Sequence, residues 1–223
     1  MGESRVWVPA AAGLLLGMCG VWAAAPVPAG TDPNEALKDL MAGNQRYVEA
    51  RRAYPHQDAE LRARLAKGQH PIAVILGCAD SRVPPELVFD EGLGDLFTVR
   101  LAGELPDDLS LGSIEYAVEH LGTRLIVVLG HQKCGAVDAA MHSPSAPGHI
   151  QALLAAIQPA IQGASEAGHD ALDAAVRANV RHVVAALEGD APILAEAVKS
   201  GHVRIVGAEY ELESGKIELL SRP

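Results

Sequence analysis

The chain has 223 residues, of which 49% are hydrophobic and 21% charged, and this is the balance of one compact globular domain. Its 28 acidic and 18 basic residues give a formal net charge of −10, and no stretch gathers enough basic residues to follow a phosphate backbone, which argues against a nucleic-acid-binding protein. Three cysteines are too few for a disulfide scaffold, so the core must come from ordinary apolar burial.

Residues 1–29 predict a signal peptide for export. A short charged start leads into an apolar run over residues 6–25, which ends in small residues before a proline-rich stretch. Cleavage could follow Ala23 or Ala29, because each puts a small residue at the last position of the leader. The alternative is an uncleaved membrane anchor, although the alanine-rich end of the run suits a peptidase. We expect residues 30–223 to form a single exported domain, periplasmic or secreted.

The first elements after the leader are expected to be helical. Residues 33–52 open with Pro-Asn-Glu and repeat apolar side chains at helical spacing, which predicts an amphipathic arm that is broken near Gly43 and Asn44. A second helical stretch follows over residues 58–68.

Three short apolar runs predict buried parallel strands. They cover residues 71–77, 96–101 and 124–130, and the first is bounded by proline and glycine. A predicted helix over residues 111–121 separates the second run from the third. A strand, a helix and another strand in this order imply a right-handed crossover within one parallel sheet.

The last third of the chain is expected to be mainly helical. An alanine-rich helix runs from about His149 to Ser200, followed by a strand over residues 202–212 and a hairpin partner over residues 216–220 at a sheet edge. We find no internal repeat and no second domain. The expected fold class is therefore α/β, with a mainly parallel β-sheet flanked by helices and an N-terminal helical arm.

Two cysteines and a histidine are placed to bind a metal. Cys78 directly follows one predicted strand and His131 directly follows another, so both side chains lie at the carboxyl ends of parallel strands, where open α/β sheets bind ligands. Cys134 follows His131 at His-x-x-Cys spacing. Two thiolates and one imidazole suit zinc, and three protein ligands with an open fourth position are typical of a catalytic site.

Asp80 and Arg82 follow Cys78 closely and could form a bidentate ion pair. Near a metal the carboxylate could close the fourth coordination position, or it could be held by Arg82 and accept a hydrogen bond from metal-bound hydroxide. The plainer alternative is an ion pair that caps the next helix.

The alternative for Cys78 and Cys134 is a disulfide or a redox pair in an oxidising compartment. They are far apart in the sequence and not arranged as Cys-x-x-Cys, and a disulfide would leave His131 unexplained. Metal binding is the better hypothesis.

Four motifs resemble the β-class carbonic anhydrases. They are GCADSRVPPE at 77–86, VRLAG at 99–103, SIEYAV at 113–118 and GHQKCGAV at 130–137. The resemblance extends over nearly the whole chain after the leader.

The resemblance implies roles for individual residues. Cys78, His131 and Cys134 would bind one Zn²⁺ per chain, and Asp80 with Arg82 would be the catalytic dyad. The residues that match the family's small substrate pocket, including a glutamine that binds bicarbonate, are Gln69, Phe97, Tyr116 and Gly135. Members of the family form dimers or larger oligomers with sites at the dimer interface and the N-terminal arm around the neighbour, so we expect a homodimer or homotetramer.

Two departures from the family stand out. Leu101 and Glu104 replace residues of a common Arg-Asn-Ala-Gly-Asn motif, and they are expected close to the pocket rim. The bicarbonate-inhibited branch of the family uses a tryptophan in a non-catalytic anion site, but Trp7 and Trp22 both lie in the leader. Together with Gln69, this favours the branch whose resting zinc keeps a water.

The expected function is reversible hydration of carbon dioxide to bicarbonate and a proton by zinc-bound hydroxide. Two thiolates offset the charge of the metal, so its water should be less acidic than at a site of three imidazoles, and activity should rise at alkaline pH. The alternatives are hydrolysis of carbonyl sulfide or carbon disulfide at the same zinc, or a non-catalytic zinc-binding protein whose site Glu104 has disabled.

Overall fold

A computed structural model of the chain describes residues 30–189 and 191–221. The predicted signal peptide, with Trp7 and Trp22, lies outside the described residues. Among the helices of the described ranges, none combines the length and apolarity needed to cross a membrane.

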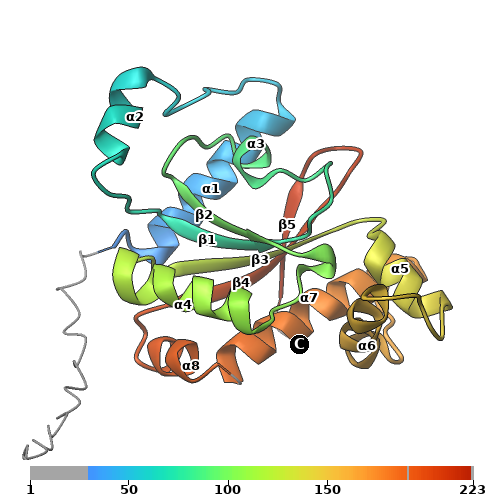
Figure 1. Cartoon of the computed structure of the whole chain (residues 1–223). Coiled ribbons are helices and arrows are strands. Elements are labelled where there is room, and N and C mark those ends of the chain that lie inside the picture. Colours follow the sequence, from blue (N-terminus) through green and yellow to red (C-terminus); the bar gives the residue numbers. More distant parts are fainter. Residues whose placement is uncertain (1–29, 190, 222–223) are drawn as a thin grey trace, which may run out of the picture.

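Helices and strands alternate along most of the chain (Figure 1). In chain order they are α1 (Pro33–Val48), α2 (Ala59–Leu65), β1 (Ala73–Gly77), α3 (Pro85–Val88), β2 (Leu96–Arg100), the 3₁₀ turn η1 (Ala102–Glu104), α4 (Asp108–Leu121), β3 (Leu125–His131), α5 (Gly135–His142), α6 (Ile150–Ile161), α7 (Ala171–Gly189), α8 (Pro192–Lys199), β4 (Arg204–Tyr210) and β5 (Ile217–Leu220).

One five-stranded sheet forms the centre of the molecule, in the order β2-β1-β3-β4-β5. The first four strands are parallel, and β5 pairs antiparallel with β4 as a hairpin partner at the edge. This confirms the predicted fold class of a mainly parallel sheet with flanking helices.

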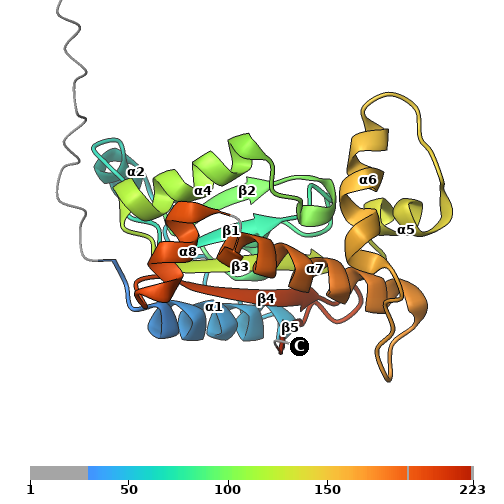
Figure 2. The same ribbon diagram turned by 90° about the horizontal axis from the view of Figure 1, so that it is seen from below.

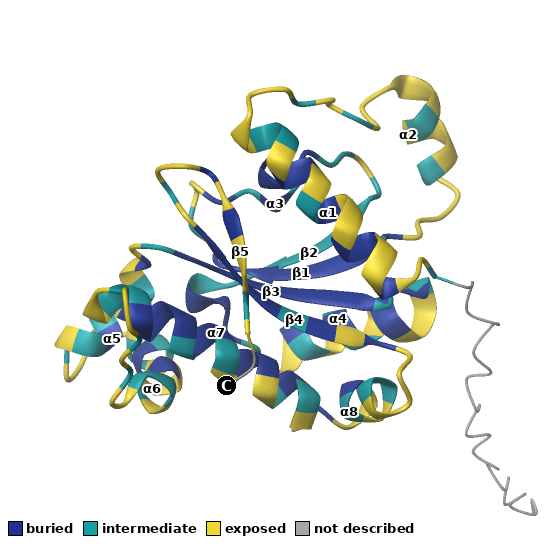
Figure 3. Ribbon diagram, turned by 180° about the vertical axis from the view of Figure 1, so that it is seen from behind, coloured by how far each residue is buried: buried dark blue, intermediate teal, exposed yellow. Residues whose placement is uncertain are grey.

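Helices cover both faces of the sheet and one of its ends. Apolar side chains of α4, α7 and α8 pack on one face, and those of α1 and α3 pack on the other (Figure 1). Beyond one end of the sheet lie α5 and α6 (Figure 2), which pack together with Cys78 and Cys134 in a third apolar cluster. Both β1 and β3 are buried along their whole length (Figure 3). Their continuous apolar runs follow from this burial on both faces.

The predicted break in the N-terminal arm is wrong, because α1 continues through Gly43 and Asn44. A Cβ atom at Gly43 would lie 1.8 Å from the carbonyl oxygen of Phe89, so the glycine lets the helix approach the backbone closely. The Asn44 amide donates hydrogen bonds of 2.9 Å to the carbonyl oxygens of Val88 and Gly215. Both residues therefore serve packing, and neither marks a helix end.

The alanine-rich helix predicted from His149 to Ser200 is confirmed as mainly helical, but the segment is divided into α6, α7 and α8. After α6 the chain turns at Gly163, whose φ of 70° lies in the left-handed region that favours glycine. Pro192 occupies the first turn of α8, where its missing N–H has no helical partner to lose. Alanine-rich composition concealed these breaks.

Candidate metal centre

Cys78, His131 and Cys134 meet at the carboxyl end of the sheet. Cys78 follows the last residue of β1, His131 is the last residue of β3, and Cys134 is the N-cap of α5. One ligand atom from each of the three lies within 4.8 Å of the others. All three residues are buried, with His131 completely enclosed. Adjacent parallel strands thus bring together residues that are more than 50 positions apart in the sequence.

The chemistry of these three side chains fits a zinc ion. The Nδ1 atom of His131 lies 2.8 Å from the carbonyl oxygen of Gln132, which orients the ring. Its Nε2 atom is buried without a hydrogen-bond partner in the described residues. Cys78 and Cys134 carry free thiols, so the structure does not support the disulfide alternative. A buried ring nitrogen beside two unoxidised sulfurs suits a tetrahedral site of nitrogen and sulfur ligands.

The two sulfurs are electrostatically unequal. A hydrogen bond from the Cys134 thiol lowers the pKa of Cys78 to about 4 despite its burial. The same interaction, together with burial, raises the pKa of Cys134. The lowered pKa of Cys78 favours its thiolate form, and a buried negative charge attracts a cation.

Asp80 lies beside the three residues and is held by Arg82. The Arg82 Nε and Nη2 atoms donate to the two carboxylate oxygens at 2.9 and 2.8 Å, and the Arg82 backbone N–H donates to Oδ1 at 2.9 Å. These contacts with Arg82 keep the pKa of Asp80 well below its usual range. Asp80 Oδ2 lies 3.8 Å from the Nε2 atom of His131. The carboxylate is thus ionised and close to the three candidate metal ligands while it remains bound to Arg82.

Arg100 holds the backbone on either side of Ala79 and was not singled out from the sequence. From the end of β2, its Nε donates to the carbonyl oxygen of Cys78 at 2.8 Å and its Nη2 donates to the carbonyl oxygen of Asp80. Arg100 pairs with Gly77 across the sheet. Its position at the carboxyl end of the strand next to Cys78 is the signal that could have identified it.

The 3₁₀ turn η1, which follows β2, contacts the Cys78 sulfur through its backbone. The backbone N–H of Gly103 donates to the Sγ atom of Cys78 at 3.4 Å. The Asn179 amide on α7 donates to the Gly103 carbonyl and to Glu104 Oε1, both at 2.9 Å.

The expectation that Glu104 lies close to the pocket rim is wrong. Glu104 is completely buried, because a left-handed backbone with φ of 45° turns its side chain inward to Asn179. Burial and the nearby Cys78 raise the pKa of Glu104 to about 8. Leu101 is partly buried and packs against the core formed with α4 and α7.

Most of the residues predicted for the substrate pocket lie away from the candidate metal ligands of their own chain. Gln69 precedes β1 and lines a surface pocket at its amino end, whereas Cys78 follows the opposite end, across roughly 17 Å of strand. Phe97 lies in the amino-terminal half of β2, and Tyr116 on α4 is half exposed. Only Gly135, directly after Cys134, is beside the site, with open space where a side chain would extend.

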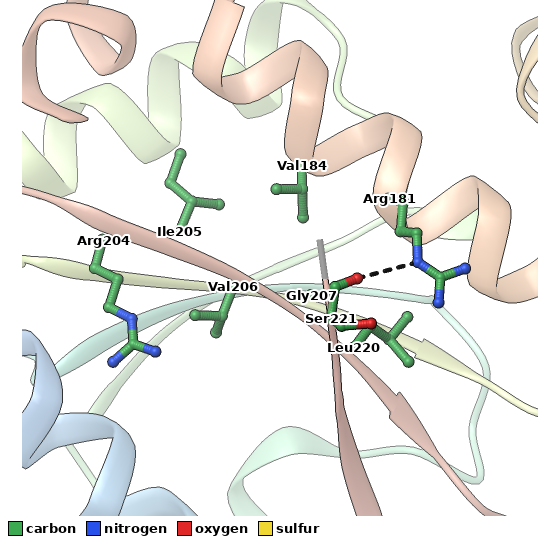
Figure 4. Close-up of a pocket in the computed structure, with 8 residues that line it drawn as sticks. All are labelled: Arg181, Val184, Arg204, Ile205, Val206, Gly207, Leu220 and Ser221. Atoms are coloured by element: carbon green, nitrogen blue, oxygen red, sulfur yellow. Dashed lines mark hydrogen bonds between the residues drawn. The ribbon is translucent and has the colours of Figure 1, made fainter. Parts of the chain in front are cut away.

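Another pocket lies away from the three metal-binding candidates (Figure 4). It opens between α7 and the amino-terminal half of β4, whereas the other end of β4 pairs with His131. Its two arginines already have partners, since Arg181 binds Glu166 and the Ser221 carbonyl, and Arg204 binds Asn34. This pocket therefore contributes no group to the candidate centre.

Comparisons with known proteins point to one family. A family model described as carbonic anhydrase matches residues 73–217. Carbonic anhydrase 2 of Mycobacterium tuberculosis is 42% identical over 193 residues, which cover 85% of this chain and 93% of the relative. A solved β-carbonic anhydrase of Aspergillus fumigatus has a TM-score of 0.65 and 28% identity, covering 84% of this chain and 91% of that chain. A tetrameric β-carbonic anhydrase from Sordaria macrospora has a TM-score of 0.67 at 23% identity over 84% of this chain and 98% of that chain, and supports the fold alone.

Proposed function

Because the chain belongs to the β-carbonic anhydrase family and is an enzyme of that kind, we propose that it hydrates carbon dioxide reversibly to bicarbonate and a proton, at one Zn²⁺ held by Cys78, His131 and Cys134. The observation that carries the proposal is the buried group of two thiols and one imidazole within 4.8 Å of one another, next to a carboxylate held by arginine. A sheet edge that only stabilised the fold would not need this combination.

Each side chain has a distinct task in the proposed reaction. When bound, zinc would act as a Lewis acid that lowers the pKa of water, so that the hydroxide needed to attack carbon dioxide is available. Asp80 accepts a hydrogen bond from the attacking water and thereby orients it. Arg82 binds both carboxylate oxygens, so it keeps Asp80 ionised and able only to accept.

The ligand charges predict the pH dependence. Thiolates at Cys78 and Cys134 offset the formal charge of Zn²⁺, which weakens the effect of the metal on water compared with a site of three neutral imidazoles. Activity should therefore rise on the alkaline side of neutrality. A profile that stays flat into the acid range would contradict the proposed ligand set.

A second copy of the chain completes the substrate pocket in this proposal. Gln69, Phe97 and Tyr116 are too far from Cys78 along the sheet to serve the site of their own chain, yet Tyr116 is half exposed and β2 is an open edge of the sheet. A homodimer that joins this side of two copies would bring the three residues to the neighbouring metal ligands. Whether such dimers pair further into tetramers does not affect the site. We also propose export, on the strength of the leader predicted over residues 1–29.

The non-catalytic alternative has lost its main argument. It held that Glu104 disables the site, whereas the Glu104 side chain is buried and accepts a hydrogen bond from Asn179, which supports the catalytic proposal. No feature of the described residues favours the sulfur-containing substrates over carbon dioxide.

The test is stopped-flow hydration of carbon dioxide at alkaline pH, on protein whose zinc content has been measured. We expect rapid hydration with one zinc per chain, and loss of both in Cys134→Ala. Ser143→Ala, which changes the C-cap of the same helix α5, should retain both. One zinc per chain without hydration would refute the activity and leave the metal site standing.

A further inference from the structure

We propose that Asn179 is a positioning residue for the metal centre: it holds the backbone N–H of Gly103 against the Cys78 sulfur and so sets how strongly that sulfur donates to the metal. The inference rests on the proposed function only in assuming that the metal binds at Cys78.

The contacts form a continuous path from α7 to the sulfur. One amide nitrogen of Asn179 donates to the Gly103 carbonyl and to Glu104 Oε1, each at 2.9 Å. The N–H of Gly103 then donates to Cys78 Sγ at 3.4 Å, within the usual range for sulfur acceptors. Asn179 does not itself touch the sulfur, so its effect must pass through the turn.

The turn needs an external support of this kind. Gly103 and Glu104 adopt successive left-handed backbone conformations, with φ of 76° and 45°. For Glu104, which carries a Cβ atom, such a conformation is sparsely populated and costs about 1 kcal/mol or more. Because Asn179 binds the backbone of one residue and the side chain of the other, it stabilises the conformation that presents the Gly103 N–H to Cys78.

Asn179 also carries a cost that packing alone does not explain. The residue is completely buried, and its Oδ1 atom has no hydrogen-bond partner in the described residues. A buried polar atom left unpaired costs about 1–3 kcal/mol. A leucine of similar size would remove this unpaired oxygen but would leave the Gly103 carbonyl and Glu104 Oε1 without their donor, so what this position supplies is the N–H group of the amide.

The consequence for the metal follows from the electron density on sulfur. A hydrogen bond to a thiolate withdraws charge from it, so the sulfur donates less to the metal and the metal remains a stronger Lewis acid. Loss of Asn179 should free the Gly103 turn and so remove its hydrogen bond to the Cys78 sulfur. Because the sulfur is then displaced, the site should bind zinc less well. Because the thiolate then donates more strongly, hydration should occur only at higher pH.

The test substitutes Co²⁺ for zinc and compares Asn179→Leu with Asn44→Leu. Asn44 is a suitable control because it is also a buried asparagine whose amide nitrogen donates to two acceptors, here the carbonyl oxygens of Val88 and Gly215, but it lies on the opposite face of the sheet. We expect Asn179→Leu to move the thiolate-to-cobalt charge-transfer absorption to lower energy, and to weaken zinc binding by about 10- to 100-fold in competition with a chelator. Asn44→Leu should lose stability with neither change.

Further readouts separate this inference from the proposed function. The pH midpoint of carbon dioxide hydration should move to the alkaline side in Asn179→Leu, whereas the cobalt spectrum reports on the sulfur even if the protein hydrates nothing. Asn179→Ser, which keeps one shorter donor, should give a smaller shift and provides a second variant if the leucine variant does not fold. An unchanged cobalt spectrum and unchanged zinc affinity in the folded Asn179 variants would overturn the inference, whatever the hydration rate.

Discussion

Arg82 acts on Asp80 through the shape of its guanidinium group as well as through its charge. Its two nitrogens contact both carboxylate oxygens, and Nη2 also donates to the Lys133 carbonyl at 3.3 Å, so one side chain links Asp80 to the loop between His131 and Cys134. A lysine would keep the charge but offer a single point of contact.

The first prediction is that Arg82→Lys lowers kcat/KM for hydration by about 10- to 100-fold, since loss of a charge-assisted hydrogen bond costs about 1.5–3 kcal/mol. Zinc content should not change, because Arg82 is not a ligand. Stopped-flow rates on zinc-quantified protein measure both quantities. Arg52→Lys, on the segment after α1, is the charge-matched control. Full activity in Arg82→Lys would mean that the bidentate geometry has no part in the reaction.

For single residues, the sequence predicted the position of those that lie at the ends of strands. Cys78 and His131 could be placed together because each directly follows an apolar run, and parallel strands end at a common edge. Glu104 and Asn179 could not be paired in this way, since 75 positions separate them and their contact depends on an unusual backbone conformation at Glu104. Local sequence gives no signal for a contact of that kind.

Helix α7 contributes a second buried polar side chain besides Asn179, and it binds carboxylates of the last two strands. Arg177 on α7 donates to Glu209 of β4 at 2.7 Å and to Glu218 of β5 at 2.9 Å. The two carboxylates respond differently because their surroundings differ. Burial and the neighbouring Asp173 raise the pKa of Glu209 to about 8 in spite of Arg177, whereas Arg177 lowers the pKa of the largely exposed Glu218.

The second prediction concerns stability between pH 5 and pH 8. Folded Glu209 keeps a proton that the unfolded chain releases above about pH 4.5, so its contribution to stability is lost as the pH rises toward about 8. Glu209→Gln cannot ionise and should reduce this decline, with a Tm about 2–4 °C above the parent protein at pH 8, equivalent to about 1 kcal/mol. Thermal unfolding at a series of pH values measures the effect.

Glu218→Gln is the matched control, because it removes a carboxylate bound to the same arginine. Its pKa is lowered on folding, so the stability that it contributes is present at neutral pH and lost as the pH falls. This variant should therefore be less stable than the parent at neutral pH and approach it in acid. Parallel pH profiles for the two variants would show that the buried position of Glu209 has no thermodynamic effect.

Element boundaries were harder to predict than element types. The parallel strands were recognisable because burial on both faces requires continuous apolar runs. The breaks between α6, α7 and α8 were not, since alanine favours helix wherever it occurs. Gly43 led to the prediction of a helix break that does not exist. Its role is close contact with the Phe89 carbonyl, which depends on tertiary packing.

In the proposed function, a single chain supplies only part of each site. The proposed metal ligands lie at the carboxyl end of the sheet, while Gln69 lies beyond the amino end of β1 and Tyr116 is half exposed on α4. Local sequence motifs predicted both groups of residues, but a motif carries no information about which copy of the chain supplies each group. If two copies share each site, neither group is sufficient alone.

The third prediction is that two defective variants restore activity when mixed. Cys134→Ala lacks a metal ligand but keeps Gln69, whereas Gln69→Ala keeps the ligands of its own chain. In a mixed dimer, the ligands of the Gln69→Ala chain meet the intact Gln69 of the Cys134→Ala chain, which gives one complete site. Random reassociation makes half of the dimers mixed, so about a quarter of parental activity should return beyond the residual activity of the two variants. Stopped-flow hydration before and after subunit exchange measures this gain, and exchange of Cys134→Ala with a Cys78→Ala variant is the control that should restore none. If each chain used its own Gln69, mixing would give only the average of the two variants, and the proposed shared site would be wrong even with the dimer intact.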